Sequence, residues 1–188
     1  MSVLIVLLLA ILSRVLPVAL HSQSWNFSLL GGSLLFLGSR MAQDSPRRAA
    51  WKIGGVLAAL VVTDYCITVY GYRLPFHYSG VYLTIWLWYA GMMIASMGLF
   101  RKLTAVRVVA GVVAGPTSFF LLSNFAVWVA GMYAHTAAGL AQCYIMGLPF
   151  YRNDLVSTGL TAGALFGLPA VAARIAEGFH AADHNIAA

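Results

Sequence analysis

The sequence predicts an all-α polytopic membrane protein with six transmembrane helices. Of its 188 residues, 61% are hydrophobic and 9% are charged, whereas a soluble domain carries roughly 45–50% apolar and about 25% charged residues. The apolar residues form long runs, and most charged residues fall between them. So few polar side chains could not cover a water-soluble fold. A cytosolic enzyme, a nucleic-acid binder and a disordered chain are therefore excluded.

The length of the chain sets the number of spans. A transmembrane helix needs about 20 residues, so a chain of 188 residues has room for six spans joined by short loops. We expect a single integral membrane domain over residues 1–188. The predicted spans cover residues 3–20, 26–39, 51–68, 81–100, 106–129 and 155–173.

The first two spans are the least regular. Arg14 and Pro17 interrupt the first. Residues 26–39 are few for a full span, so we expect this segment to be tilted, broken or shielded from lipid by protein. Residues 1–20 also fit a cleaved signal peptide, although they lack the basic amino-terminal region of one.

The third and fourth spans are continuous apolar runs, whereas prolines lie within the fifth span and just before the sixth. Pro116 lies near the middle of the fifth span and is expected to kink or break it, because proline removes a backbone hydrogen bond. The stretch from about Ala137 to Met146 predicts a short interfacial helix before the last span. It is too short to cross a bilayer, and Gly147 to Pro149 are expected to end it.

Basic residues predict the orientation of the bundle. Loops on the cytoplasmic side of a membrane protein are enriched in Lys and Arg. With both termini in the cytoplasm, the cytoplasmic side holds Arg40, Arg47, Arg48, Lys52, Arg101, Lys102, Arg107 and Arg174, and the external side holds Arg14, Arg73 and Arg152. We therefore expect a multi-pass protein of the bacterial inner membrane with both termini cytoplasmic.

Two ionisable residues fall inside predicted spans at similar depth. Arg14 lies in the first span and Asp64 in the third, and charges within spans are usually paired or functional. We expect them to form an ion pair under the external face. The pair either fixes helix packing, or Asp64 lines a substrate cavity.

Aromatic residues concentrate toward the predicted external side. They form either an interfacial belt or the walls of an outward-opening cavity for a flat, amphipathic ligand. The group comprises Trp25, Phe27, Tyr65, Tyr70, Tyr72, Phe76, Tyr78, Tyr82, Trp86, Phe125, Trp128, Tyr133, Phe150 and Tyr151.

Small residues repeat at helical spacing in the last two spans. Such spacing lets helices approach closely, either within the chain or against a partner subunit. The repeats are Gly111 and Gly115 in the fifth span, and Gly159, Gly163 and Gly167 in the sixth.

Signatures of catalysis are missing from the sequence. It contains no Walker P-loop, no HExxH or GxSxG motif and no cysteine-rich metal pattern. Cys66 and Cys143 lie in apolar surroundings and are expected to be small buried side chains. We therefore do not expect an enzyme.

Two stretches resemble a bacterial membrane-protein family of unknown function. The first is Trp25-Asn26-Phe27-Ser28 followed by Gly31-Gly32. The second begins at Ser123-Asn124-Phe125-Ala126-Val127-Trp128 and continues through Tyr133, Cys143-Tyr144 and Gly147-Leu148-Pro149-Phe150. This family is similar to the substrate-binding S-components of energy-coupling-factor transporters and to solitary cobalamin importers. The resemblance implies six helices and an external substrate pocket.

The resemblance also implies candidate site residues. His77 takes the position of an external-loop residue that is an axial cobalt ligand, typically cysteine, in the cobalamin importers. Imidazole can bind cobalt but cannot perform thiolate chemistry, and the alternative is a solvated loop histidine. Together with the polar and aromatic residues above, the candidate substrate-binding set is Asn26, Phe27, Asp64, His77, Tyr82, Asn124, Trp128 and Tyr133.

Two functions are consistent with the sequence. The first is an uptake protein that captures a vitamin-like substrate, with a corrinoid such as cobalamin as the specific candidate, alone or with an energy-coupling module. The second is a structural or accessory subunit of a larger membrane complex. The expected partners are the lipid bilayer, a small-molecule ligand and a membrane subunit, with no nucleic acid.

Overall fold

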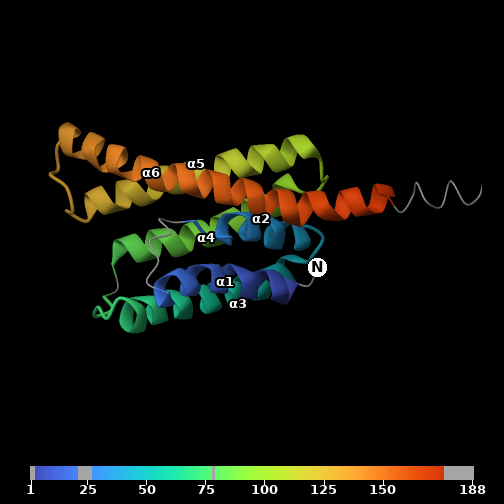
Figure 1. The fold of residues 1–188 in the computed structure, drawn as a ribbon, viewed down its shortest axis with the longest axis horizontal. Helices are drawn as coiled ribbons and strands as arrows, with labels where there is room; N and C mark the ends of the chain where they lie inside the picture. The colour runs from blue at the N-terminus through green and yellow to red at the C-terminus, as the bar shows by residue number, and fades with distance from the viewer. Residues whose placement is uncertain (1–2, 21–26, 78, 176–188) are drawn as a thin grey trace, which may run out of the picture.

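The computed structural model is a bundle of helices that lie side by side (Figure 1). It describes residues 3–20, 27–77 and 79–175, and these residues contain no strand. The all-α prediction is confirmed. The elements are α1 (Val3–Ala19), α2 (Leu30–Arg40), α3 (Pro46–Cys66) with the π-helical turn η1 (Ile67–Gly71), α4 (Gly80–Leu99), α5 (Ala105–Val129), and α6 (Ala137–Ala162) with η2 (Gly163–Gly167).

Among the described residues, four helices are long and apolar enough to cross a bilayer. They cover Pro46–Gly71, Gly80–Leu99, Ala105–Val129 and Ala137–Ile175. Helix α1 is apolar but has 17 residues, and α2 has 11 residues. An 11-residue helix is about 16 Å long, roughly half the hydrocarbon thickness. Length and composition therefore support a membrane protein with four candidate spans, and the count of six stays a prediction.

Hydroxyl side chains set where the long helices begin. The caps accept a backbone N–H three residues on, which satisfies one donor that the first helical turn leaves free. Helix α3 begins five residues before the expected start because Ser45 caps it and Pro46 occupies its first position. The four caps are Ser45, Ser79, Thr104 and Thr136.

Helix α2 forms the centre of the bundle. Every residue from Leu30 to Gly38 is buried, so the expected shielding of this segment by protein is present. Glycines allow the close approach. A Cβ on Gly32 would lie 2.6 Å from the Cβ of Thr161 on α6, and one on Gly38 would lie 2.5 Å from the backbone of Met93 on α4. The half-length helix is thus held between α4 and α6.

Helix α6 differs from the sequence prediction of a short interfacial helix followed by a separate last span. The expected interfacial helix and last span are one continuous helix from Ala137 to Ile175, and Pro149 lies inside it. Contacts with α5 hold the part before the proline. The Tyr144 hydroxyl donates to the carbonyl of Leu121 at 2.9 Å, and the Cys143 thiol donates to that of Asn124 at 3.2 Å. Packing therefore outweighs the single backbone hydrogen bond that Pro149 removes.

Helix α5 continues through Pro116 without a break. Hydroxyl groups next to the proline bond to nearby carbonyls, from Thr117 to Val113 at 2.7 Å and from Ser118 to Gly115 at 2.8 Å. Such bonds are a common accommodation of proline in membrane helices. Gly111 and Gly115 pack against Leu35, Phe100 and Met92, so this glycine pair serves contacts within the chain.

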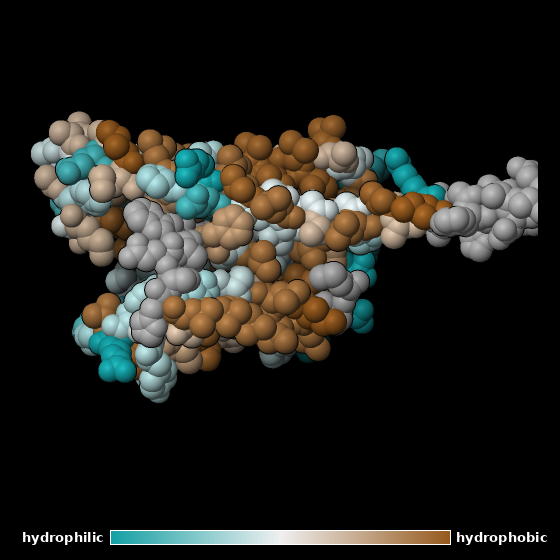
Figure 2. Space-filling view, viewed as in Figure 1, coloured by the Kyte–Doolittle hydropathy of each residue, from teal (hydrophilic) through white to brown (hydrophobic). Residues whose placement is uncertain are grey.

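The face of the bundle shown in Figure 2 is largely apolar in its middle, with more polar residues toward the two ends. Large apolar side chains are exposed on several helices, among them Leu4, Val62, Leu87, Val113 and Leu160. Exposed apolar surface of this kind is typical of a protein that contacts a membrane or other proteins. We call the end with residues 41–45 and 100–104 the basic end, and the end with residues 72–77 and 130–136 the aromatic end (Figure 1).

Candidate functional site

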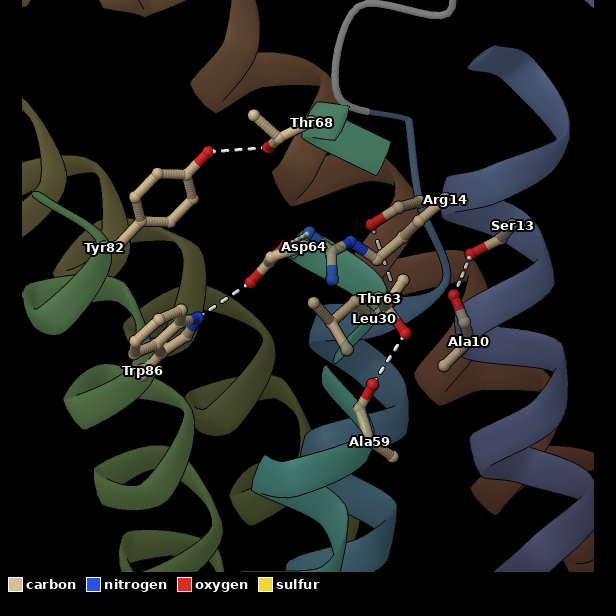
Figure 3. Close-up of polar contacts among 11 residues, drawn as sticks. Ala10, Ser13, Arg14, Leu30, Ala59, Thr63, Asp64, Thr68, Tyr82 and Trp86 are labelled. Carbon is tan, nitrogen blue, oxygen red and sulfur yellow. Dashed lines mark hydrogen bonds and ion pairs between the residues drawn. The ribbon is translucent and has the colours of Figure 1, made fainter. Parts of the chain in front are cut away.

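A buried carboxylate joins three helices near the aromatic end (Figure 3). Asp64 on α3 accepts a hydrogen bond and ion pair from Arg14 on α1 through one oxygen. Its other oxygen accepts from the indole N–H of Trp86 on α4 at 2.8 Å. The contact that the sequence predicts between Arg14 and Asp64 is therefore present. We call these three residues the Asp64 cluster.

The burial of the Asp64 cluster bears on its role. The side chain of Asp64 is 7% exposed and that of Arg14 is 18% exposed. Both carboxylate oxygens have donors, whereas Nη1 of Arg14 is buried with no hydrogen-bond partner among the described residues. Pairing lowers the large cost of burying each charge alone. Since Asp64 has its partners already, the geometry favours a packing role over substrate contact.

An aromatic row extends from this cluster toward the aromatic end. Trp86, Tyr82, Phe76 and Tyr65 follow one another with ring centroids 5.7, 5.0 and 5.4 Å apart. The Tyr82 hydroxyl lies 2.8 Å from that of Thr68 (Figure 3). These rings pack mainly on each other, so the predicted residue Tyr82 belongs to this row.

A separate cavity of about 280 Å³ lies between α4, α5 and α6, and its lining residues on α4 and α5 lie from about the middle of these helices toward the aromatic end. Its walls are mainly aliphatic and aromatic, with polar groups from Ser123, Asn124, Tyr151 and Asp154. Of the predicted substrate-binding residues, Asn124 lines it. The remaining lining residues are Val81, Ile85, Pro116, Phe119, Phe120, Val127, Gly147 and Phe150.

Asp154 is the charged residue of this cavity that the sequence prediction left out. Its Oδ1 accepts a 3.4 Å hydrogen bond from the Thr158 hydroxyl one turn on. The same oxygen faces the start of α2, 3.5 Å from where a Cβ on Gly31 would lie. The chain contains only five acidic residues, and that scarcity was the signal that could have identified it.

Asn124 and Tyr151 are held in place by contacts within the bundle. The Asn124 amide donates to the carbonyl of Phe120 at 2.8 Å, and Gly147 leaves the space that its side chain occupies. The Tyr151 hydroxyl lies 2.9 Å from that of Thr117. The cavity is therefore lined by polar groups that are already oriented, as ligand sites usually are.

The other predicted residues do not join this cavity. The Trp128 indole donates to the carbonyl of Ala134 at 2.9 Å in the connection between α5 and α6, and Tyr133 lies half-buried in the same connection. Phe27 and His77 are exposed, and Asn26 lies outside the described residues. Within residues 3–20, 27–77 and 79–175, no three His, Cys, Asp or Glu side chains cluster to hold a metal ion.

Comparison with known proteins identifies a family whose function is unknown. A model of a family of unknown function, DUF6580, matches residues 1–179. The chain belongs to this family. Searches of curated proteins and of solved structures each gave no match. This membership agrees with the predicted resemblance to a membrane-protein family of unknown function.

Proposed function

We propose that this protein is a membrane substrate-binding and uptake protein, similar in role to an S-component, that captures a small vitamin-like ligand in the cavity between α4, α5 and α6. The observation that carries the proposal is the cavity itself. It is lined mostly by apolar and aromatic side chains, with a few oriented polar groups and the carboxylate of Asp154. Such a composition is typical of small-molecule sites, and an ionisable residue at membrane depth usually has a function.

The proposed orientation places the cavity on the external side. The basic end carries Arg40, Arg47, Arg48, Arg101 and Lys102, and basic loops face the cytoplasm in most membrane proteins. The aromatic end then faces outward, and a ligand from outside reaches the cavity without crossing the whole bilayer. After capture, release inward requires reorientation of the bundle, alone or driven by an energy-coupling partner.

The size of the cavity bears on the substrate. A cavity of about 280 Å³ lies at the lower limit of the usual range for small-molecule sites, about 300–1,000 Å³. A corrinoid is far larger and could not be enclosed there. The proposed cobalt ligand, His77, is exposed and does not line the cavity. We therefore propose a smaller vitamin-like substrate ahead of cobalamin.

The test compares two substitutions that lie close together in the sequence but on different faces of α4. Val81 lines the cavity, whereas Leu83 is 56% exposed at the surface. Native mass spectrometry and an absorbance spectrum of the protein in mild detergent should reveal a bound small molecule. Val81→Trp should remove it and Leu83→Trp should retain it. Loss in both variants, or retention in both, would contradict the cavity as the binding site, and a corrinoid spectrum would restore cobalamin.

One observation favours the second function, an accessory subunit of a larger complex. A Cβ added at Gly163 or Gly167 would meet nothing within 4 Å, so this part of the glycine repeat is not used for close contacts between the described helices. It is free to approach a partner helix. Gly163→Leu should then release a copurifying membrane subunit while leaving the isolated chain folded, with Gly54→Leu, at another open position, as the control.

A further inference from the structure

We infer that the ligand of the cavity is a small organic cation, with a protonated amine or quaternary ammonium on Asp154 and an apolar body against the aromatic walls. The inference rests on the proposed function, because it assigns the substrate class of the same cavity. Its strongest support is the contrast among the acidic residues whose surroundings the structure describes.

Two of these acidic residues have cationic partners. Asp44 pairs with Lys52 at 2.6 Å and lies 4.0 Å from Arg48, and Asp64 pairs with Arg14. Asp154 has no Lys, Arg or His within 4.0 Å in the described ranges. A carboxylate at membrane depth without a counter-ion is costly. A cationic ligand would supply the missing charge.

The described groups that face the Asp154 carboxyl are dipoles, and none of them carries a full positive charge. Its Oδ1 faces the first turn of α2 at Gly31, and the amino-terminal end of a helix carries a partial positive charge. The hydroxyl of Thr158 adds a weak hydrogen bond at 3.4 Å. Both are dipoles, so a full positive charge in the cavity is still favourable.

The walls of the cavity also suit a cation with an apolar body. Phe119, Phe120, Phe150 and Tyr151 line it, and the rings of Phe120 and Tyr151 lie 4.9 Å apart, tilted by 31°. Aromatic faces attract ammonium groups. No Lys or Arg is among its described lining residues, so nothing there compensates an anionic ligand.

The experiment uses three probes that share one aromatic body and differ in charge. Phenethylamine is cationic at neutral pH, 2-phenylethanol is uncharged and phenylacetate is anionic. Their dissociation constants are measured calorimetrically with the full chain in lipid nanodiscs. Phenethylamine should bind the wild type most tightly and phenylacetate least. Asp154→Asn should weaken phenethylamine roughly tenfold or more and leave 2-phenylethanol unchanged.

Control variants distinguish an effect of the Asp154 charge on ligand binding from a loss of folding or of the binding site. Asp154→Glu keeps the charge and should keep the preference for the amine, while Asp44→Asn at the basic end should alter no probe. Equal binding of the amine and the alcohol to the wild type, or an Asp154→Asn variant that binds the amine normally, would overturn the inference while leaving the cavity as a site. Absence of binding by all three probes would count against the proposed function as well.

Discussion

Two aspartates at similar positions in the bundle differ in their partners. Asp64 receives Arg14 and Trp86 on its two oxygens and ties α1, α3 and α4 together. Asp154 lines a cavity, receives one weak bond from Thr158 within its own helix, and has no Lys, Arg or His within 4.0 Å among the described residues. The same residue type is therefore paired with a cation in one place and lines a cavity in the other. The two aspartates differ in the hydrogen-bond donors and cations that contact their side chains.

The largest effect should come from breaking the Asp64 cluster. Asp64→Leu leaves the Arg14 guanidinium buried without a counter-ion, and removing one partner of a buried pair costs about 3–5 kcal/mol. The free energy of unfolding, measured by denaturant titration in mixed micelles, should fall by that amount.

A double variant tests whether the cost arises from the unpaired charge. Replacement of both members by apolar residues is often neutral, so Arg14→Leu with Asp64→Leu should recover most of the stability. Asp44→Asn, which loses an ion pair to the solvent-accessible side chain of Lys52, should cost less than about 1 kcal/mol. A double variant no better than Asp64→Leu would place the cost elsewhere.

Loss of the second donor to Asp64 should have the next largest effect. Trp86→Phe keeps an aromatic ring near Tyr82 but removes the 2.8 Å hydrogen bond to Asp64. Hydrogen bonds to charged groups contribute about 1.5–3 kcal/mol. The same titration should show a loss in that range. An unchanged stability would mean that Arg14 alone satisfies Asp64.

The start of α2 contacts both α1, which carries the partner of Asp64, and α6, which carries Asp154. Leu29 N–H donates to the Ser13 hydroxyl of α1 at 3.0 Å, while Gly32 packs on α6. Gly32→Ala would force a Cβ against Thr161, and overpacking costs about 1–3 kcal/mol. Gly54→Ala, at an open position, should be neutral or slightly stabilising. Equal effects would contradict the close packing of α2 on α6.

The smallest effect should follow the matched substitution at the second aspartate. Asp154→Leu removes no ion pair, only the weak Thr158 bond and an interaction with the helix dipole, so the stability should change by less than about 1 kcal/mol. Unfolding titration beside Asp64→Leu makes the comparison direct. A loss as large as that of Asp64→Leu would make Asp154 a structural residue and end its assignment to a ligand.

The Arg14–Asp64 contact was predictable from sequence because few charges interrupt the apolar runs. Two opposite charges at similar depth in separate spans leave few alternatives. The cavity was not predictable in the same way. Its lining comes from three helices. Of the candidate substrate-binding residues it contains Asn124, and of the aromatic group it contains Phe150 and Tyr151. Tyr82 and Trp128 belong to the same aromatic group in the sequence, but in the structure they make their contacts outside the cavity.

The sequence by itself indicated a membrane protein, the approximate position of most helices and the separation of a basic end from an aromatic end. These properties depend on local composition and on capping residues such as Ser45. Only the tertiary structure decided that α2 is a buried half-length helix and that α6 continues through Pro149. It also decided that Asp154 lines a cavity while Asp64 is paired with Arg14. The physical reason is that burial and charge pairing depend on which helices meet, and residues distant in sequence decide that.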